Sequence, residues 1–459
     1  MVVPNDTVVA LSTPSGRSGI GVIRISGDDS LRILRSLIAA ESYNPTPHLL
    51  SLKSLIDPNT SETLDESLVC FFKGPHSFTG EDVVELHCHG SPVLLRTIID
   101  LVLTLGARLA DPGEFSLRAL MNGRLMLTEA EAIRDVIDAQ TDTALRQATR
   151  QLKGEISSRL RPAKEKLLEI IVRLESSLEF VEDDLPAVAS DSIIESLKEV
   201  QLDLSRLRST FSTGRLLRDG IRVVLVGRPN VGKSSVFNML VGHGRAIVTD
   251  IAGTTRDTLT ESIGVDGIPV LLVDTAGIRS SKNEIESIGV ARARREAADA
   301  DLLIVVIDGS ESLADEDRIV LDEVSQTRHI VVLNKSDLAS FSLTTLDTQC
   351  DVSNRADVVS VSAKTEAGLE SLRTAILKPF ANGNAHNEGL LITNARHHDL
   401  LGRSVADIAS SEQLLIERAS EELVLVGLHN ALRDLGEITG ETTTEEILGQ
   451  IFSTFCIGK

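Results

Sequence analysis

The chain has 459 residues, a formal net charge of −21 and 42% hydrophobic residues. At roughly 150 residues per domain this length predicts about three domains, and the negative charge argues against a broad, non-specific binder of phosphate backbones. The apolar runs are too short to span a bilayer, the start has no secretory pattern, and the four cysteines suggest neither a disulfide framework nor a paired zinc motif. We expect a cytoplasmic protein with no membrane attachment.

The first two parts of the chain differ in their hydrophobic pattern. Residues 7–118 combine short apolar runs with Gly, Pro and Ser and contain one helical stretch, which predicts a mixed α+β domain over residues 1–119. From residue 127 to 214 glycine is nearly absent and apolar residues recur every three or four positions. This spacing predicts a helical domain over residues 120–214.

The rest of the chain begins with strands rich in Val, Ile and Leu that alternate with helices. This pattern predicts a mostly parallel sheet covered on both faces, and we assign it to residues 215–380. Helical periodicity then returns over residues 381–459. Because each helical stretch is too short to form a hydrophobic core by itself, we expect the two to pack together, with the α/β domain inserted between them.

A phosphate-binding loop follows the first of these strands and opens a helix. Its sequence, GRPNVGKS at Gly227–Ser234, matches GxxxxGK[ST]. The glycines let backbone N–H groups surround phosphates, Lys233 reaches the outer phosphates, and Ser234 binds magnesium. The loop by itself predicts a nucleoside triphosphate.

Four later elements, each at a strand end or in a polar loop, specify GTP. Asp274 places a carboxylate beside the magnesium ion, and Thr255 completes the metal shell. Asp337 can accept the guanine N1–H and the 2-amino group, which adenine lacks, and Ser362–Lys364 supplies backbone to the base. We expect GTP to contact Asn230, Val231, Gly232, Lys233, Ser234, Ser235, Thr249, Asp250, Ile251, Ala252, Gly253, Thr254, Thr255, Asp274, Thr275, Ala276, Gly277, Asn334, Lys335, Ser336, Asp337, Ser362, Ala363 and Lys364.

The residue after Gly277 is Ile278, which cannot orient water as the glutamine of Ras-like switches does. The Asn230 amide oxygen and backbone carbonyls of residues 249–254 offer neutral oxygens that could hold a monovalent cation near the phosphates. Alternatively, Asn230 only stabilises the loop.

Residues 141–175 carry more basic than acidic side chains. Their helical spacing suits either a local RNA contact or an ordinary solvated helix face. The basic residues are Arg146, Arg150, Lys153, Arg159, Arg161, Lys164, Lys166 and Arg173.

Together these motifs resemble the tRNA-modification GTPase family MnmE, also called TrmE. The resemblance covers nearly the whole chain and includes PGEFSLRALMNGRL at Pro112–Leu125, DIAGTTRD, DTAGIR, EIESIG and the C-terminal LGQIFSTFCIGK. It implies a multidomain α/β fold: an N-terminal α+β domain that binds tetrahydrofolate and dimerises, a discontinuous all-α helical domain, and an inserted Ras-like α/β P-loop G domain.

The resemblance also implies an activity. A potassium-activated GTPase of this family acts with the flavoprotein MnmG, also called GidA, to add an aminomethyl or carboxymethylaminomethyl group to C5 of the wobble uridine of certain tRNAs. The carbon would come from 5-formyl- or methylene-tetrahydrofolate, and FAD would be bound only by the partner. The expected assembly is a homodimer that joins MnmG as a heterotetramer or larger complex. A ribosome-assembly GTPase switch without modifying activity is the alternative.

Site residues follow from the same resemblance. The magnesium ligands would be Ser234 and Thr255, and the potassium ligands Asn230, Thr249, Ile251 and Thr254. Catalytic roles would fall to Glu286, which positions water, and to Asn230, Arg256, Asp257 and Cys456. Folate would be bound by Arg24, Glu85, Arg124 and Lys459.

Two of these regions have other interpretations. Strand alternation places Glu85, His87 and His89 on one face, which suits a folate pocket, a satisfied polar face or a zinc site. Cys456, in the terminal CIGK, is either catalytic or a buried, inert thiol.

Overall fold

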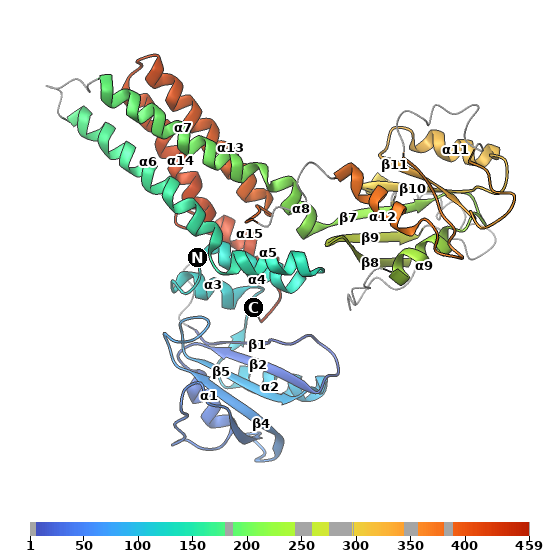
Figure 1. Cartoon of the computed structure of the whole chain (residues 1–459). Helices are drawn as coiled ribbons and strands as arrows, with labels where there is room; N and C mark the ends of the chain where they lie inside the picture. Colours follow the sequence, from blue (N-terminus) through green and yellow to red (C-terminus); the bar gives the residue numbers. More distant parts are fainter. Residues whose placement is uncertain are drawn as a thin grey trace. The chain divides into compact units, whose positions relative to one another are not determined.

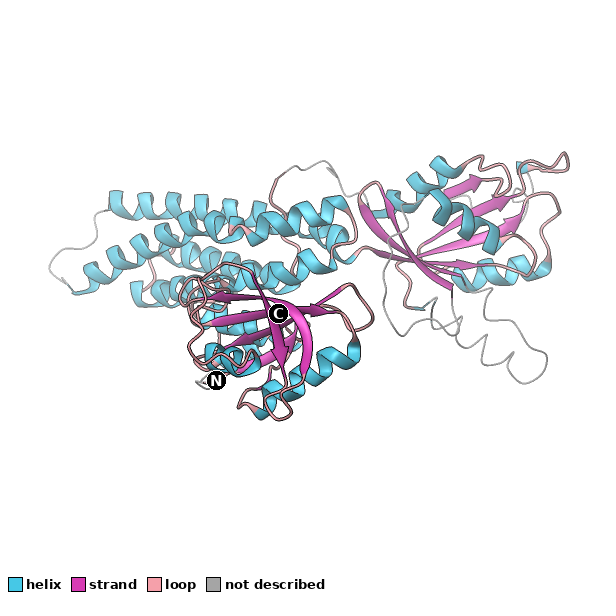
Figure 2. Cartoon of the chain, turned by 90° about the horizontal axis from the view of Figure 1, so that it is seen from below, coloured by secondary structure: helices cyan, strands magenta, loops and turns pink. Residues whose placement is uncertain are grey.

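The computed structural model describes residues 6–179, 187–243, 259–274, 296, 298–343, 357–380 and 389–458. The chain divides into two compact units, each discontinuous in sequence. One comprises Met1–Arg134, Gln151–Lys198 and Ala406–Lys459, and the other Asp135–Arg150 and Glu199–Val405. Each unit contains one six-stranded sheet together with helices (Figures 1 and 2), which agrees with the expected multidomain α/β fold.

The N-terminal sheet has the order β3-β4-β5-β2-β1-β6, antiparallel except for the β1–β6 pair. Alternate residues such as Ile23, Val84 and Leu86 are buried in one core with helices α1 and α2, because side chains alternate between the faces of a strand. The elements are β1 (Val8–Leu11), β2 (Ile20–Ser26), α1 (Ser30–Leu37), β3 (Ser51–Ile56), β4 (Thr63–Phe72), β5 (Val83–His89), α2 (Pro92–Thr104) and β6 (Arg108–Leu109).

Long helices make up most of the remaining part of the first unit. Helices α6 and α14 come from the two separate helical stretches and pack against each other, as the sequence predicts. Each buries one apolar stripe, with Leu160, Leu167 and Leu174 on α6 and Leu428 and Leu435 on α14. The remaining helices of this unit are α3 (Glu114–Met121), α4 (Leu127–Asp138), α6 (Glu155–Glu179), α14 (Glu421–Thr439) and α15 (Glu445–Ser453). Helices α7 (Ala187–Ser209) and α13 (Ala395–Ile416) are divided between the two units, and α5 (Asp142–Leu152) and α8 (Phe211–Asp219) belong mainly to the second.

The second sheet has the order β12-β11-β10-β7-β9-β8 and is parallel except for the β8–β9 pair. Every residue of the central strand β10 is buried, because helices cover both faces. The elements are β7 (Ile221–Val226), α9 (Lys233–His243), β8 (Leu259–Val265), β9 (Ile268–Asp274), β10 (Leu302–Asp308), α11 (Asp315–Val324), β11 (His329–Asn334), β12 (Asp357–Ser360), α12 (Leu369–Leu377) and η4 (Lys378–Phe380).

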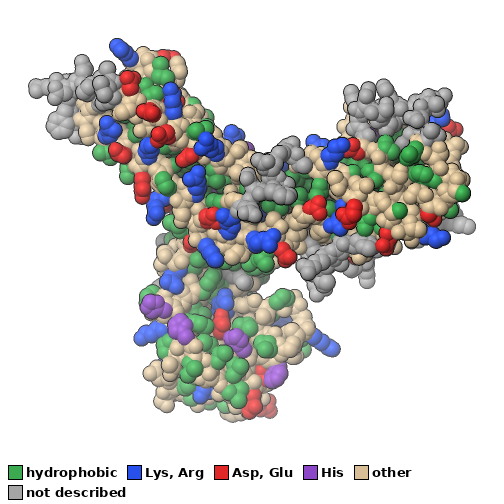
Figure 3. All heavy atoms as spheres, in the orientation of Figure 1, with side chains coloured by type: hydrophobic (Ala, Val, Ile, Leu, Met, Phe, Trp, Pro, Cys, Tyr) green, Lys and Arg blue, Asp and Glu red, His purple; other side chains and the backbone are tan. Residues whose placement is uncertain are grey.

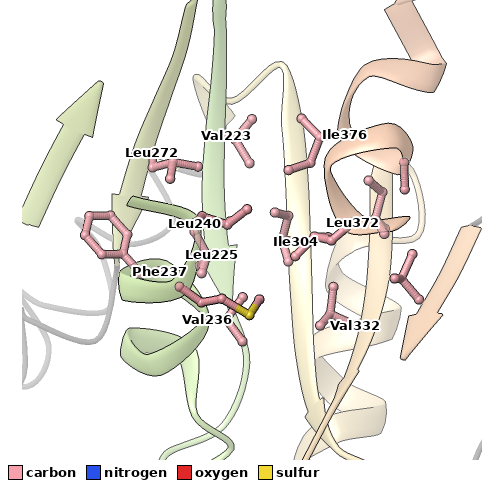
Figure 4. Packing of buried hydrophobic residues seen from close by; sticks show 14 of the residues in the cluster. Val223, Leu225, Val236, Phe237, Leu240, Leu272, Ile304, Val332, Leu372 and Ile376 are labelled. Atoms are coloured by element: carbon pink, nitrogen blue, oxygen red, sulfur yellow. The ribbon is translucent and has the colours of Figure 1, made fainter. Parts of the chain in front are cut away.

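Two cores lie on the two faces of this sheet. On one face, Leu240 of α9 and Leu372 of α12 pack with strand residues such as Leu225 and Ile304 (Figure 4). On the other face, α11 packs through Leu321 and Val324. This arrangement fixes the strand ends, and with them the loops that follow.

The described helices include none with both the length and the apolar character that crossing a membrane requires.

Candidate functional site

The predicted nucleotide motifs meet at one edge of the second sheet. The phosphate loop follows β7, Asp274 ends β9, Asn334 ends β11, and Ser362 comes two residues after β12. These four strands run parallel in one sheet. Their carboxyl ends therefore share an edge, where open α/β sheets bind ligands.

The phosphate loop requires glycine at two positions. Gly227 has a φ of 145°, and a Cβ there would lie 2.4 Å from the carbonyl oxygen of Val306. Gly232 has a φ of 95°, and a Cβ there would lie 2.2 Å from Nδ2 of Asn334. A side chain at either position would force the loop away from the sheet.

Lys233 is positioned by the loop that it serves. Its Nζ donates hydrogen bonds to the carbonyl oxygens of Gly227 and Arg228, at 2.9 and 2.8 Å. The ammonium group is thus held over the loop, where phosphate oxygens can replace the two carbonyls. Asn230, on the exposed part of the loop, has a φ of 65°, a left-handed conformation that asparagine tolerates better than most residues.

Ser234 and Asp274 supply oxygen atoms next to the loop. The Ser234 hydroxyl donates a 2.7 Å hydrogen bond to Oδ2 of Asp274. Asp274 is the last residue of β9 and is buried. A hydroxyl and a carboxylate are the hard oxygen ligands that Mg²⁺ favours, and Mg²⁺ usually takes only one or two from the protein besides phosphate and water. The pair therefore fits magnesium held on a nucleotide.

The predicted base site is built around two side chains. Asn334 donates from Nδ2 to the Val231 carbonyl at 2.9 Å and accepts the Ala363 N–H at 3.1 Å, which ties the phosphate loop to the segment after β12. The Ser362 hydroxyl donates to Oδ1 of Asp337 at 2.7 Å. This hydrogen bond lowers the pKa of Asp337, so the carboxylate is charged and able to accept donors from a guanine.

Two ion pairs beside this site were not predicted. Lys335 Nζ donates to Oδ2 of Asp308 at 2.5 Å; burial opposes ionisation of Asp308, but hydrogen bonds from Lys335 and Ser310 outweigh it and lower the pKa of that carboxyl. Arg228 of the phosphate loop donates to the buried Asp317 at 3.1 Å. Asp308 could have been predicted as a site residue, because it is an acidic residue at the end of the apolar strand β10. Nothing in the sequence indicated that Arg228 pairs with Asp317.

Part of the predicted site lies outside the described residues. Of the predicted magnesium ligands Ser234 is described, and of the potassium ligands Asn230. Ser235, Ser336 and Lys364 also belong to the described residues, each next to other residues of its motif. The predicted residues outside the description are Thr249, Asp250, Ile251, Ala252, Gly253, Thr254, Thr255, Arg256, Asp257, Thr275, Ala276, Gly277, Glu286 and Lys459.

The first unit brings together a second group of predicted residues. Arg24 and Glu85 face each other across β2 and β5, and two guanidinium nitrogens of Arg24 donate to Oε1 of Glu85 at 3.0 and 2.8 Å. The Arg24 guanidinium lies 5.6 Å from the ring centroid of Phe78 and 5.7 Å from that of Phe115. A charged pair beside two aromatic rings suits a planar, polar ligand.

The C-terminal tail reaches this same group. Arg24 Nη1 and the Ser12 hydroxyl both donate to the Gly458 carbonyl oxygen, at 3.4 and 3.3 Å. Gly458 has a φ of 92°, and a Cβ would lie 2.5 Å from the Leu11 carbonyl oxygen, so glycine is required for this close approach. Cys456 is exposed, which contradicts the buried, inert thiol as an interpretation.

Arg124 lies at a different position in the same unit. Its Nε donates to the Ser77 carbonyl oxygen at 3.2 Å, in the loop that also carries Phe78. The structure therefore links Arg124 to the Arg24–Glu85 group through this loop and not by direct contact.

Glu85, His87 and His89 lie on the partly exposed face of β5, as strand alternation predicts. His87 Nε2 lies 3.3 Å from Oε2 of Glu85, whereas His89 binds Asp65 at 2.6 Å. No group of three or more metal-binding side chains occurs among the residues with described positions. The zinc interpretation receives no support.

A buried arginine organises the N-terminal domain, and the sequence did not predict it. Arg118 is 1% exposed. It donates to Asp6 at 2.7 Å, to Glu81 at 3.1 Å and to Glu114 at 2.8 Å. Burial opposes its charge, but these carboxylates raise the pKa of Arg118. Arg118 therefore ties α3 to the loop before β5, next to the predicted folate group.

Comparisons with known proteins cover both units. A family model described as the MnmE helical domain matches residues 127–456, and one described as the GTP-binding protein TrmE N-terminus matches residues 7–124. Three relatives carry the name tRNA modification GTPase MnmE. That of Koribacter versatilis is 43% identical over 99% of both chains. That of Aquifex aeolicus is 41% identical over 99% of this chain and all of its own, and that of Alkaliphilus oremlandii 39% identical over 99% of both.

Proposed function

The chain belongs to the MnmE family of tRNA modification GTPases, and on this premise we propose that it hydrolyses GTP to drive modification of a tRNA wobble uridine. In this proposal residues 1–119 bind folate and form the dimer, and residues 215–380 hydrolyse GTP. The helical residues 120–214 and 381–459 transmit the conformational change of the G domain to the folate site. The reaction adds an aminomethyl or carboxymethylaminomethyl group to C5 of the uridine.

One observation carries the proposal most directly. Lys233, Ser234, Asp274 and Asp337 lie where parallel strands of one sheet end, so an ammonium group, a hydroxyl and two carboxylates gather at a single edge. A phosphate loop alone would support any nucleoside triphosphate. The charged Asp337 carboxylate adds a specific reason for guanine, because it accepts two donors that adenine does not present.

The residues of the site act on GTP in distinct ways. Lys233 neutralises charge on the outer phosphates, and the backbone N–H groups after Gly232 bind phosphate oxygens. Ser234 and Asp274 hold a magnesium ion, with Thr255. The ion stabilises negative charge that develops on the phosphate oxygens during hydrolysis.

We infer that a potassium ion assists this hydrolysis. The neutral amide oxygen of Asn230 lies on the loop that faces the phosphates, which fits a weakly bound monovalent cation, and Thr249, Ile251 and Thr254 would complete its shell. Glu286 would position the attacking water in place of the missing glutamine, with Arg256 and Asp257 beside it. The family relationship supports these assignments.

The Arg24–Glu85 group is our candidate for the tetrahydrofolate site. A pterin ring presents amide-like donors that Glu85 can accept, and it can pack on the rings of Phe78 and Phe115. Arg124 and Lys459 suit the glutamate tail. The hydrogen bond that Arg24 donates to the Gly458 carbonyl oxygen supports a role for the terminal segment, and we include Cys456 two residues before it in the proposed site. The bound folate, 5-formyl- or methylene-tetrahydrofolate, would supply the one-carbon unit.

The proposed partners complete the reaction. The protein would act as a homodimer and join the flavoprotein MnmG, as a heterotetramer or larger assembly, with FAD bound only by MnmG. The substrate is tRNA, and the cytoplasm is the expected compartment.

Nucleoside analysis of tRNA from cells that lack the protein tests the proposal. We expect unmodified wobble uridine in the affected tRNAs, restored by the wild-type gene but not by Asp337→Asn. Normal wobble uridine together with accumulated ribosome precursors would contradict the proposal and favour the ribosome-assembly alternative.

A further inference from the structure

A large pocket lies in the first unit, where α6 and α14 pack together. Its volume is about 720 Å³, within the range of pockets that hold small molecules or single groups of larger ligands. We name it the α6–α14 pocket. Its lining comprises Met126, Glu129, Lys153, Gly154, Ser157, Ser158, Arg161, Lys164, Glu165, Leu168, His429, Leu432, Arg433, Gly436, Thr439, Glu441 and Thr442.

Helical spacing explains why these residues share one pocket. Ser157, Arg161, Lys164 and Leu168 recur at intervals of three and four along α6, so they lie on one face of that helix. The α14 residues that line the pocket follow the same spacing. The pocket is therefore built from facing sides of two helices that are distant in sequence: Lys164 and Thr439 are 275 positions apart.

The charge of the lining differs from that of the chain. The pocket has four basic side chains against three acidic ones, whereas the whole chain has 46 basic and 67 acidic residues. Figure 3 shows blue Lys and Arg atoms interspersed with red Asp and Glu atoms along these helices. The lining thus has a formal excess of one positive charge on a protein whose net charge is −21, which makes it a more favourable place for an anion than the surface on average.

The basic side chains at the rim are available to a ligand. Arg161 is 74% exposed and lies 3.9 Å from Glu165, and Arg433 is 61% exposed and lies 4.0 Å from Asp434. Both separations exceed a charge-assisted hydrogen bond. By contrast, Lys164 is 15% exposed and bonds to Glu441 at 2.5 Å, so it is part of the pocket wall.

The other groups of the lining narrow the class of ligand. Exposed hydroxyls such as Ser158 can donate to phosphate oxygens, and Met126 and Leu168 present exposed apolar surface to a base or sugar. Glu165 can accept N–H or ribose O–H groups. A nucleotide presents anionic, apolar and donor groups together, whereas the side chains of an acidic polypeptide present mainly carboxylates, which match the apolar part of the lining less well.

We propose that the α6–α14 pocket binds an RNA strand, with a phosphodiester between Arg161 and Arg433 and a nucleoside against Met126 and Leu168. This surface contacts the RNA substrate of the reaction proposed above, and the inference rests on that proposal. It assigns a binding role to part of the basic stretch at residues 141–175. The rest of that stretch remains compatible with a solvated helix face.

The test is a titration of an unmodified, fluorescently labelled tRNA transcript with the full chain. Binding is measured by fluorescence anisotropy at salt concentrations between 50 and 200 mM. The double variant Arg161→Gln/Arg433→Gln should bind about tenfold more weakly and reduce the salt slope of log K by roughly 0.7, since the pair neutralises one phosphate and each phosphate neutralised on a single strand contributes about 0.7. Both side chains are exposed, so the thermal unfolding midpoint should not change.

The matched control is Arg173→Gln/Arg206→Gln. Arg173 lies on α6 outside the pocket. Arg206 lies 4.0 Å from Asp203, the same distance that separates Arg433 from Asp434. This control removes the same charge and should bind tRNA within about twofold of wild type.

Several results would overturn the proposal. Equal weakening in the pocket variant and the control would show that only total charge matters. Displacement of tRNA by poly-L-glutamate at matched charge would favour an acidic polypeptide as the ligand. Wild-type affinity in the pocket variant would overturn this inference alone, whereas a wild-type chain that neither binds nor modifies tRNA would also contradict the proposed function.

Discussion

The Ser234 hydroxyl donates a 2.7 Å hydrogen bond to Oδ2 of Asp274, a carboxylate buried at the end of β9. The two residues are 40 positions apart in sequence, and the parallel pairing of β7 with β9 brings them together. The hydroxyl, with this carboxylate, can present oxygen to a magnesium ion on GTP without moving the sheet. The contact therefore gives a direct way to test the proposed metal site.

Replacement of Asp274 by Asn should weaken magnesium binding. The amide has the same shape but loses the negative charge, so we expect the magnesium concentration for half-maximal GTP hydrolysis to rise by about 10-fold or more. The measurement is GTPase rate against magnesium concentration. Asp315→Asn removes the same charge from an almost fully exposed side chain and should leave the dependence unchanged; an unaltered dependence in Asp274→Asn would exclude this carboxylate from the site.

Replacement of Asp337 by Asn should change the base preference from guanine to xanthine. The carboxylate can no longer accept two guanine donors, and hydrogen bonds to a charged group contribute about 1.5–3 kcal/mol each, so kcat/KM for GTP should fall by at least about 100-fold. The Asn side chain can still accept the Ser362 hydroxyl and can donate to the xanthine 2-carbonyl. Comparison of kcat/KM for GTP and xanthosine triphosphate tests this, and an unchanged ratio would place base recognition elsewhere.

The potassium proposal predicts a difference between two substitutions of Asn230. Its φ of 65° makes alanine a strained replacement, so Asn230→Gly removes the amide without that strain, and Asn230→Asp keeps a side-chain oxygen. We expect wild type to hydrolyse GTP at least about 10-fold faster in potassium than in sodium, a difference that the Gly variant loses and the Asp variant retains in part. Equal wild-type rates in the two salts would contradict a role for potassium.

The buried Arg118 network predicts sensitivity of the N-terminal domain to acid. Burial opposes ionisation of Glu114, but hydrogen bonds from Arg108, Arg118 and the Asp111 N–H outweigh it and lower its pKa below the ordinary value of 4.5. This carboxyl therefore stabilises the fold fully above about pH 4.5, and the stabilisation is lost as pH falls through the lowered value.

Glu114→Gln should cost about 2 kcal/mol at pH 7, because a buried charged hydrogen bond is lost, and it should flatten the fall in stability below pH 4.5. The chain has one tyrosine and no tryptophan, so Tyr43 fluorescence reports on unfolding of the N-terminal domain. Glu66→Gln, at an exposed position of β4, is the control. Parallel pH profiles for Glu114→Gln and wild type would show that this network does not set acid stability.

Much of the nucleotide site could be predicted from the sequence because its parts are local. A phosphate loop, the DTAG segment at Asp274–Gly277 and the NKSD segment at Asn334–Asp337 are consecutive residues, and each needs only to follow a strand whose apolar pattern is itself local. Parallel strands in an α/β domain then place their ends at one edge. Alternation along β5 likewise placed Glu85 and His87 on one face without knowledge of the fold.

Contacts between distant segments were decided only by the tertiary structure. The Lys335–Asp308 pair depends on the neighbouring positions of β10 and β11, and the Arg118 network depends on how α3 meets the sheet. The α6–α14 pocket depends on the packing of two helices that are far apart in the chain, Glu155–Glu179 and Glu421–Thr439. Sequence periodicity identifies which face of an element is apolar, but it does not specify which other face it meets, since strand order and helix packing are set by the whole chain together.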